Sequence, residues 1–204
     1  RISSRYTKAL ARSMSNAKQV KAVTPLIDGL PSTDGFDSGD GVSLFNTAHT
    51  TVSGTNVKNT LTTQADLNET SLEQSLIDIA AMTDERGLRI AARGVKMIIP
   101  SANQFTAERL MKSQGRTGTA DNDINAIGSM GMIPQGYRVN NYLTDSDAFY
   151  IITDVPNGMK MFQRAPLKTA MEGDFDTGNV RYKARERYSF GVSDYRGIFG
   201  VEGA

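Results

Sequence analysis

The chain has 204 residues, with 23 basic and 22 acidic side chains, one histidine and no cysteine. Without cysteine, disulfides and thiolate zinc sites are excluded, and a single histidine disfavours any other zinc site, so we expect no metal and no other cofactor. Because the net charge is close to zero, nothing global attracts nucleic acid or a membrane, and any electrostatic function must be local. The length suits one sizeable domain or two small ones closely joined.

No apolar run approaches the length of a membrane span, and the basic start "RISSRYTKAL" lacks the apolar stretch of a signal peptide. The sequence therefore predicts a soluble, unexported protein with no membrane partner. The first residue is Arg rather than Met, so we expect a further segment to precede it in the natural product.

The first segment has the spacing of an amphipathic helix. Its apolar residues recur at helical intervals on one broad face: Ile2, Tyr6, Ala9, Leu10, Met14, Ala17 and Val20. Its basic residues share another face: Arg1, Arg5, Lys8 and Arg12. Pro25 is expected to end or kink the helix near Thr24, because proline disfavours helical backbone in the residue before it. The basic face is either solvated or turned toward a polyanion or an acidic neighbour.

Residues 31–64 are rich in Gly, Ser, Thr, Asp and Asn, with "VSLF" as the only apolar island. A stretch this long without periodicity is unusual in a compact domain unless it is a functional or contact-making loop. We expect a long excursion with at most a short strand or hairpin near Val42 to Phe45. We also expect it to lean on something outside this chain.

Helical periodicity returns in "LNETSLEQSLIDIAAMTDERG". Thr70 and Glu73 have capping-box spacing, and Gly87 stands where a helix stop is expected. This is the clearest helix signal in the chain.

A strand and another helix follow. "VKMIIPS" predicts a short buried strand over Val95 to Ile99. "SANQFTAERLMKS" predicts a helix capped by Ser101, with Phe105 and Leu110 among its buried residues. The polar stretch 114–125 is expected to be mobile.

The last third of the chain predicts strands. "YRVNNYL", "AFYIITD" and "MKMFQR" indicate a small, mainly antiparallel sheet joined by hairpins. The final segment alternates for more than a dozen residues. Its basic side chains point one way: Arg181, Lys183, Arg185 and Arg187. The other face is apolar apart from Glu186, with Tyr182, Ala184, Tyr188, Phe190 and Val192. A strand this long outreaches a small sheet, and we expect it to pack across the first helix.

Asp40, Ser43 and His49 raise the question of a catalytic triad. Proximity in sequence argues little, because triads are assembled on rigid elements and this Gly-rich loop has no G-x-S-x-G elbow. We favour a loop histidine that caps a turn or contacts a neighbouring segment, and we expect no enzyme.

Two further motifs are weak. The glycines of "GSMGMIPQG" have neither Walker nor dinucleotide spacing and indicate a turn or hinge. Asp34, Asp37 and Asp40 lack the closing glutamate of a calcium loop, so turn-forming aspartates are favoured.

The two basic stripes leave a second hypothesis open. Single-strand nucleic-acid binding normally needs aromatic side chains interleaved with basic ones, whereas here the tyrosines of the last strand lie opposite its arginines. This favours contact with a phosphate backbone, or salt bridges to other chains, over base recognition. A nucleic-acid-binding module that uses the basic helix face is therefore the alternative function.

Several blocks together resemble a known family. In order, they are "ALARSMSNAKQVKA", "GDGVSLFNTAHT", "ADLNETSLEQSLIDIAAMTDERGLRI", "VKMIIPSANQFTAERLM" and "VNNYLTDSDAFYIITD". The chain resembles the major capsid proteins of tailed bacteriophages, close to the Mu-like major head subunits, over nearly its whole length. "DGVSLFNTAH" is the most specific block.

The resemblance implies an α+β chain with the Hong Kong 97-like capsid fold. Residues 1–66 would hold the spine helix of the peripheral domain and the following loop region, and residues 67–177 the axial domain with its small mixed sheet. Residues 178–204 would return as a long strand to the peripheral domain. The N-terminal arm and extended loop of that fold precede the spine helix, and we do not expect them within these residues.

The function implied is structural. Copies of the chain would form hexamers and pentamers that close into an icosahedral shell around packaged double-stranded DNA, assembled in the cytoplasm of a bacterial host. The implied partners are other copies of the chain, with portal, scaffold and decoration proteins as further candidates. The basic residues of both stripes, Arg1, Arg5, Lys8, Arg12, Arg181, Lys183, Arg185 and Arg187, are candidates for subunit contacts or for facing the DNA.

Overall fold

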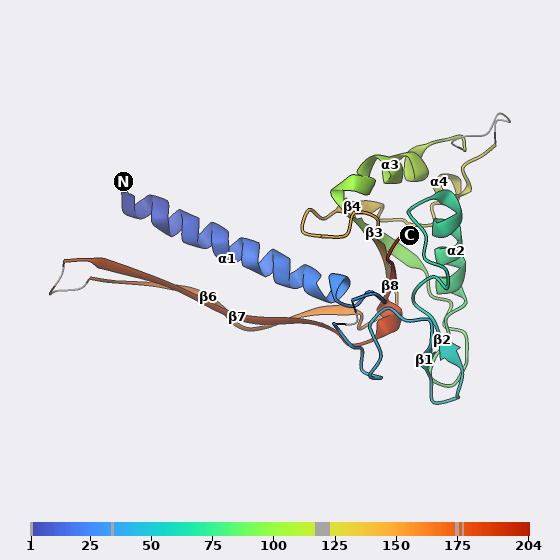
Figure 1. The fold of residues 1–204 in the computed structure, drawn as a ribbon, viewed down its shortest axis with the longest axis horizontal. Coiled ribbons are helices and arrows are strands. Elements are labelled where there is room, and N and C mark those ends of the chain that lie inside the picture. The colour runs from blue at the N-terminus through green and yellow to red at the C-terminus, as the bar shows by residue number, and fades with distance from the viewer. Residues whose placement is uncertain (1, 34, 117–122, 174–175, 177) are drawn as a thin grey trace.

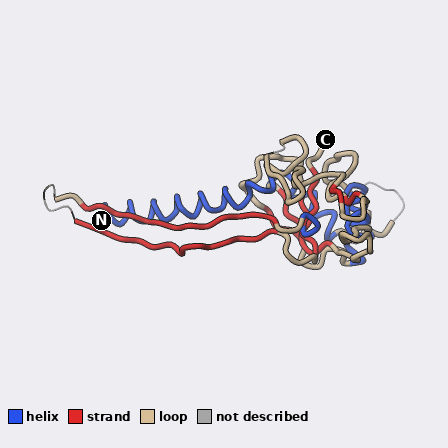
Figure 2. The backbone as a smooth tube through the Cα atoms, turned by 90° about the horizontal axis from the view of Figure 1, so that it is seen from below, coloured by secondary structure: helices blue, strands red, loops and turns tan. Residues whose placement is uncertain are grey.

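The computed structural model describes residues 2–33, 35–116, 123–173, 176 and 178–204. The chain has two parts, a rounded body and a long shaft that projects from it (Figure 1). The shaft consists of helix α1 (Ile2–Ile27) lying along a two-stranded antiparallel hairpin of β6 (Met159–Gly173) and β7 (Val180–Val192). The other helices and strands form the body. Figure 2 shows, from a second direction, that the helix and both strands run side by side.

The body is built on a four-stranded mixed sheet. Its strands are β4 (Tyr137–Val139), β3 (Gly94–Ile99), β5 (Phe149–Thr153) and β8 (Ile198–Val201), paired in that order. Strand β3 is parallel to β4, whereas β5 is antiparallel to both β3 and β8. The helices of the body are α2 (Glu69–Ala80), α3 (Gln104–Lys112) and the short α4 (Ala126–Met130). Two single 3-10 turns, η1 (Ser101–Asn103) and η2 (Tyr195–Gly197), and a small hairpin, β1 (His49–Thr50) with β2 (Asn56–Val57), complete it.

The core has two parts. The larger cluster packs α2 and α3 against the sheet and includes Leu72, Ile79 and Met97. The smaller cluster lies where the last turns of α1 reach the body, and includes Leu26 and Phe45. The shaft is thus anchored at one end by a buried apolar cluster, while the rest of it stands away from the body.

The shaft confirms the prediction that the long last strand packs across the first helix. Lys18 of α1 forms an ion pair with Glu186 of β7 at 2.5 Å and lies over the Tyr188 ring. The Glu186 side chain is only 7% exposed, so the one charged interruption of the apolar face is explained by this pairing. Leu10 and Met14 are half-buried on the same side of the helix.

Two details of the first helix were predicted wrongly. Tyr6 and Val20 were placed on the packed face but are 72% and 47% exposed, because the hairpin covers a narrower strip of the helix than the predicted face. The helix also does not end near Thr24. It continues through Pro25 to Ile27, where the Asp28 amide donates to the Thr24 carbonyl at 2.8 Å and the last turn is buried against the body.

The polar stretch after α1 packs in part on its own chain, and its contact with something outside the chain stays a prediction. Leu44 and Phe45 are fully buried in the smaller core cluster. They do not lie in a strand: Ser43 makes a single β-bridge with Asp37, and the hairpin forms farther on, at β1 and β2. Leu44, Phe45, Val57 and Leu61 anchor the stretch to the body, whereas Val52 is 89% exposed.

The predicted helix over residues 67–87 is confirmed, but its ends differ. Asn68 is the N-cap: its side chain accepts from the Ser71 amide at 2.8 Å, and the Ser71 hydroxyl accepts from the Asn68 amide at 3.0 Å. The capping box therefore lies two residues before the predicted pair Thr70 and Glu73. The helix ends at Ala80, and Gly87 occupies a later turn with a φ of 83°.

The predicted strand over Val95 to Ile99 is confirmed as β3. In the helix that follows, Leu110 is buried as predicted, but Phe105 is 75% exposed and Ser101 opens a 3-10 turn without a side-chain cap. Part of the polar stretch 114–125 lies outside the described residues. "MKMFQR" does not join the small sheet but forms the base of β6, because its partner is the long strand β7.

Candidate functional site

His49 lies in a buried polar cluster. Its ring is fully buried and stacks on the Tyr195 ring with the centroids 3.9 Å apart. Its Nδ1 lies 2.7 Å from Asp40 Oδ2, and its Nε2 lies 3.1 Å from Asn59 Oδ1. Both ring nitrogens are therefore engaged with oxygen atoms of the same chain.

This arrangement excludes the triad of Asp40, Ser43 and His49. The Ser43 hydroxyl donates to the Phe45 carbonyl at 3.1 Å and is not bonded to the histidine, whose second nitrogen meets Asn59 instead. A nucleophile needs a base within hydrogen-bond reach, and none is supplied here. His49 contacts neighbouring segments of its own chain, but it lies in the short strand β1 and not in a loop as predicted.

Asn59 is the residue of this cluster that the sequence did not reveal. Its amide nitrogen donates to the carbonyls of Leu44, Tyr195 and Ile198 at 2.7, 3.1 and 3.4 Å. Its Oδ1 also accepts from the Asn46 amide at 2.9 Å. Asn59 thus joins the loop before β1 to the segment that enters β8. The only sequence hint was the apolar island "VSLF" beside the sole histidine, which marks buried loop structure but not its partner.

Ionisation of the Asp40 carboxylate makes the stability of this cluster depend on pH. Burial raises the pKa of Asp40, but hydrogen bonds from Ser38 and His49 outweigh burial and hold its pKa below the ordinary value of 3.8. A carboxylate whose pKa is depressed on folding contributes stability above its unfolded pKa, and this stability is lost as the pH falls through the folded value.

We therefore expect Asp40→Asn to lower the free energy of unfolding at pH 7 while reducing its decline below about pH 4. Urea unfolding of both proteins from pH 7 to pH 3 measures this difference. Parallel pH profiles for the two proteins would contradict the assignment.

Other predicted motifs have structural roles. Gly131 and Gly136 occupy turns with φ of 60° and 65°, as predicted, whereas Gly128 lies within α4 and not in a turn. Within the described residues, no group of three or more His, Cys, Asp or Glu side chains is placed to hold a metal ion. Asp34 of the acidic loop lies outside the described residues. No helix in the described part of the chain has the length and apolar character that crossing a membrane requires.

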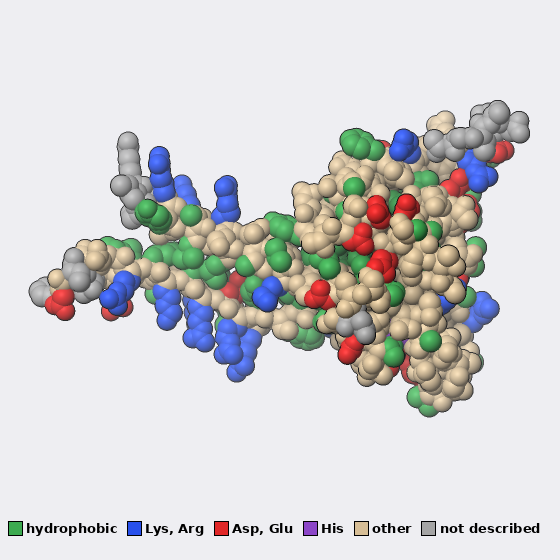
Figure 3. Space-filling model, viewed as in Figure 1, with side chains coloured by type: hydrophobic (Ala, Val, Ile, Leu, Met, Phe, Trp, Pro, Cys, Tyr) green, Lys and Arg blue, Asp and Glu red, His purple; other side chains and the backbone are tan. Residues whose placement is uncertain are grey.

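The basic residues line both outer faces of the shaft. Arg5, Lys8 and Arg12 are exposed on the side of α1 that faces away from the hairpin, and Arg1 lies outside the described residues. The other four lie on β7, all exposed: Arg181, Lys183, Arg185 and Arg187. In Figure 3, Lys and Arg side chains project from the two opposite edges of the shaft. The structure therefore brings the two predicted stripes into one element but does not merge them into one patch.

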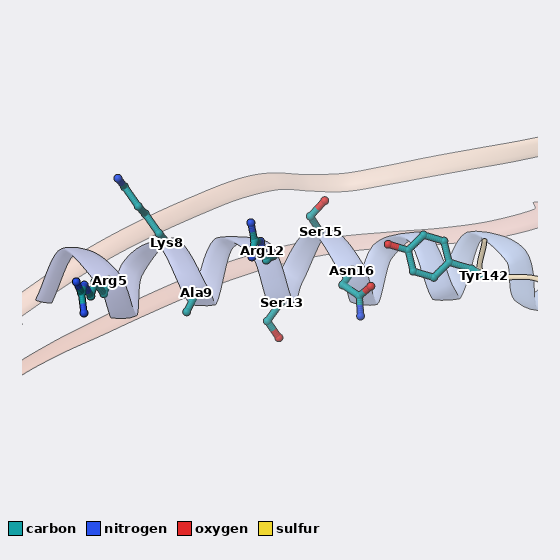
Figure 4. A pocket seen from close by; sticks show the side chains of 8 residues that line it. All are labelled: Arg5, Lys8, Ala9, Arg12, Ser13, Ser15, Asn16 and Tyr142. Atoms are coloured by element: carbon teal, nitrogen blue, oxygen red, sulfur yellow. The ribbon is translucent and has the colours of Figure 1, made fainter. Parts of the chain in front are cut away.

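The α1 stripe borders an open groove of about 1040 Å³. Its polar lining comes from both parts of the molecule: Arg5, Lys8, Arg12, Ser13, Ser15, Asn16 and Tyr142. Figure 4 shows these side chains along one side of the helix, with Tyr142 reaching in from the body. The groove is positively charged and hydroxyl-rich, which suits an anionic surface.

The arrangement of shaft and body is also found in solved structures of phage capsid proteins. The capsid of an empty GTA particle has a similar fold, with a TM-score of 0.55 and 16% identity over 100% of this chain and 66% of that chain. The capsid of Myoviridae Phage XM1 gives a TM-score of 0.53 at 14% identity, over 100% of this chain and 65% of that chain. A chain of Mycobacterium phage Che8 gives a TM-score of 0.52 at 16% identity, over 98% of this chain and 63% of that chain. This is the Hong Kong 97-like fold of phage capsid subunits.

The sequence agrees with the fold. The family model described as phage capsid protein matches residues 2–201, and the chain belongs to that family. Like the members of its family and these neighbours, it is a structural capsid protein and not an enzyme. The chain spans about two thirds of the length of the solved capsid chains it resembles. No curated protein sequence matches it.

Proposed function

We propose that the protein is a major head subunit whose copies assemble as hexamers and pentamers into an icosahedral shell around packaged double-stranded DNA. In this proposal the shaft is the peripheral domain, with α1 as its spine helix, and the body contains the axial domain. The shells are assembled in the cytoplasm of the bacterial host and form the capsid of the virion. Portal, scaffold and decoration proteins are further partners.

The shape of the shaft carries this proposal. An isolated two-stranded hairpin is marginally stable in water, and open strand edges invite pairing with another chain. The hairpin also exposes large apolar side chains: Met161, Phe162, Leu167, Met171, Val180 and Tyr182. Exposed apolar surface on an extended element is typical of an interaction site. These features are explained if neighbouring subunits cover the shaft.

The basic stripes fit the same proposal. Contacts that are individually weak become decisive when a symmetric lattice repeats them. The β7 stripe of Arg181, Lys183, Arg185 and Arg187 and the α1 stripe of Arg1, Arg5, Lys8 and Arg12 are the proposed subunit-contact or DNA-facing residues.

Sedimentation velocity of the full-length protein, with negative-stain imaging of the fastest fraction, tests the proposal. We expect rings of five or six subunits, or closed shells. A monomer at every concentration and salt tested would contradict the proposal. If that monomer bound nucleic acid with strong salt dependence, the alternative of a nucleic-acid-binding module would replace it.

A further inference from the structure

Charge is divided very unevenly between the two parts of the molecule. The elements α1, β6 and β7 contain 12 of the 23 basic residues of the chain but only two of its 22 acidic residues. The body, residues 28–158 and 193–204, contains 10 basic and 18 acidic residues. The net charge of +1 conceals a strongly basic shaft joined to a strongly acidic body. Two such molecules attract each other most when the shaft of one meets the body of the other.

The α1 groove is an unpartnered basic surface. Arg5, Lys8 and Arg12 are exposed, and none forms an ion pair with any other described residue. The three residues are spaced at helical intervals, so they form a row on the side of α1 that the hairpin does not cover. Ser13, Asn16 and Tyr142 add hydrogen-bonding groups along the same groove (Figure 4).

The body carries a matching acidic surface. Asp66, Asp147 and Glu202 come from three segments far apart in sequence, yet the structure gathers them near the end of β8, where Gly203 lies against both Asp147 and Asp66. Asp145 lies beside Asp147, whose amide donates to the Asp145 Oδ1 at 2.9 Å. None of these four carboxylates has an ion-pair partner within the described part of the chain. Figure 3 shows acidic side chains on the visible face of the body.

These two surfaces do not neutralise each other within one molecule. We propose that the α1 groove of one copy binds the acidic surface (Asp66, Asp145, Asp147 and Glu202) of a neighbouring copy. The inference rests on the proposed function and adds to it the pair of surfaces that meet. Because the two surfaces differ, the contact is head-to-tail, and such contacts generate rings when the rotation between copies closes. A self-complementary dimer does not result.

Charge reversal in the full-length protein tests the contact. The groove variant carries Arg5→Glu, Lys8→Glu and Arg12→Glu, and the surface variant carries Asp66→Arg, Asp147→Arg and Glu202→Arg. Asp145 is left unchanged because its Oδ1 accepts from the backbone amides of Asp147 and Ala148, whereas the Asp66 carboxylate accepts a backbone bond only from the terminal residue Ala204. All changed side chains are solvent-accessible, so each variant is expected to keep its fold, which circular dichroism and thermal melting verify.

We expect each variant alone to raise the concentration needed for assembly by about tenfold or more, because like charges then face each other. The chain that carries both sets of changes is expected to assemble at close to the normal concentration, because the attraction is restored with its sign reversed. Rising salt should weaken the contact in the unchanged protein, since exposed charges are screened.

The matched control changes Arg86, Arg89 and Arg93 to Glu, which alters the net charge equally but lies on an exposed loop of the body. This control is expected to assemble normally; if it fails as the groove variant does, net charge and not the groove is responsible, and the inference is overturned. Failure of the doubly changed, folded chain to assemble also overturns it. Normal assembly of the groove variant with reduced DNA content would identify DNA as the occupant instead.

Failure of this inference is distinguishable from failure of the proposed function. If the unchanged protein forms rings or shells and the reversals have no effect, only the assigned contact is wrong. If the unchanged protein never assembles, the proposed function itself fails. Sedimentation velocity of the unchanged protein therefore precedes the variants.

Discussion

Asn59→Ala is expected to lower the free energy of unfolding by about 3–5 kcal/mol. The side chain is fully buried, and it is the only described group that satisfies the His49 Nε2. Alanine would leave buried carbonyl groups and the imidazole without partners, and each unsatisfied buried group costs about 1–3 kcal/mol. It would also leave a cavity, which adds to the loss.

Urea unfolding of the unassembled subunit measures this effect. Asn141→Ala is the matched control, because Asn141 is exposed and makes no side-chain hydrogen bond in the described structure. We expect the control to change the free energy of unfolding by less than about 0.5 kcal/mol. A loss below about 1 kcal/mol for Asn59→Ala would show that the buried cluster contributes little to the stability of the body.

Gly197→Ala is expected to destabilise the joint between shaft and body by about 3 kcal/mol. A Cβ at this position would lie 2.3 Å from the Gly158 Cα and 2.9 Å from its amide nitrogen. Backbone atoms cannot move aside as the end of a long side chain can, so one of the two segments must shift. Gly158 immediately precedes β6, and the turn before it bonds to Asp194 at 2.9 Å, so the shift would loosen the hairpin where it leaves the body.

Gly173→Ala is the control for this prediction. A Cβ on Gly173 meets nothing within 4 Å, and glycine weakens a strand relative to alanine, so the control should be neutral or slightly stabilising. Thermal melting gives the global effect, and hydrogen exchange of the residues around Gly158 locates it. Equal melting temperatures for the two variants would contradict the close contact between the backbones.

The elements with strong local patterns were predictable. The first helix, the helix over Glu69–Ala80, the strand over Gly94–Ile99 and the long last strand all follow from hydrophobic periodicity, which reports which face of an element is buried. The packing of the last strand on the first helix was also predictable, because each has one apolar and one basic face. Glu186 is the one charged residue on the apolar face of the last strand. Its ion pair with Lys18 could not be predicted from the sequence of either segment alone.

Element ends were less predictable because several residues compete for the same role. Asn68 with Ser71 and Thr70 with Glu73 both satisfy the spacing of a capping box, and only the path of the chain before the helix selects the first pair. In the same way, Pro25 disfavours helix locally, but burial of the next turn against the body outweighs that preference. Local propensity is a weak prior that tertiary contacts override.

The sequence by itself determined the class of this protein: an α+β capsid subunit without cysteine chemistry, with a basic first helix and a basic last strand. Periodicity, composition and family-specific blocks such as "DGVSLFNTAH" are local properties, and they survive without knowledge of the fold. Only the tertiary structure decided that His49 is a buried structural residue, that Asn59 joins distant segments, and that charge is separated between shaft and body. Those three features depend on residues more than a hundred positions apart, as in the Asn59 bond to Tyr195, and no local pattern encodes which distant groups will meet.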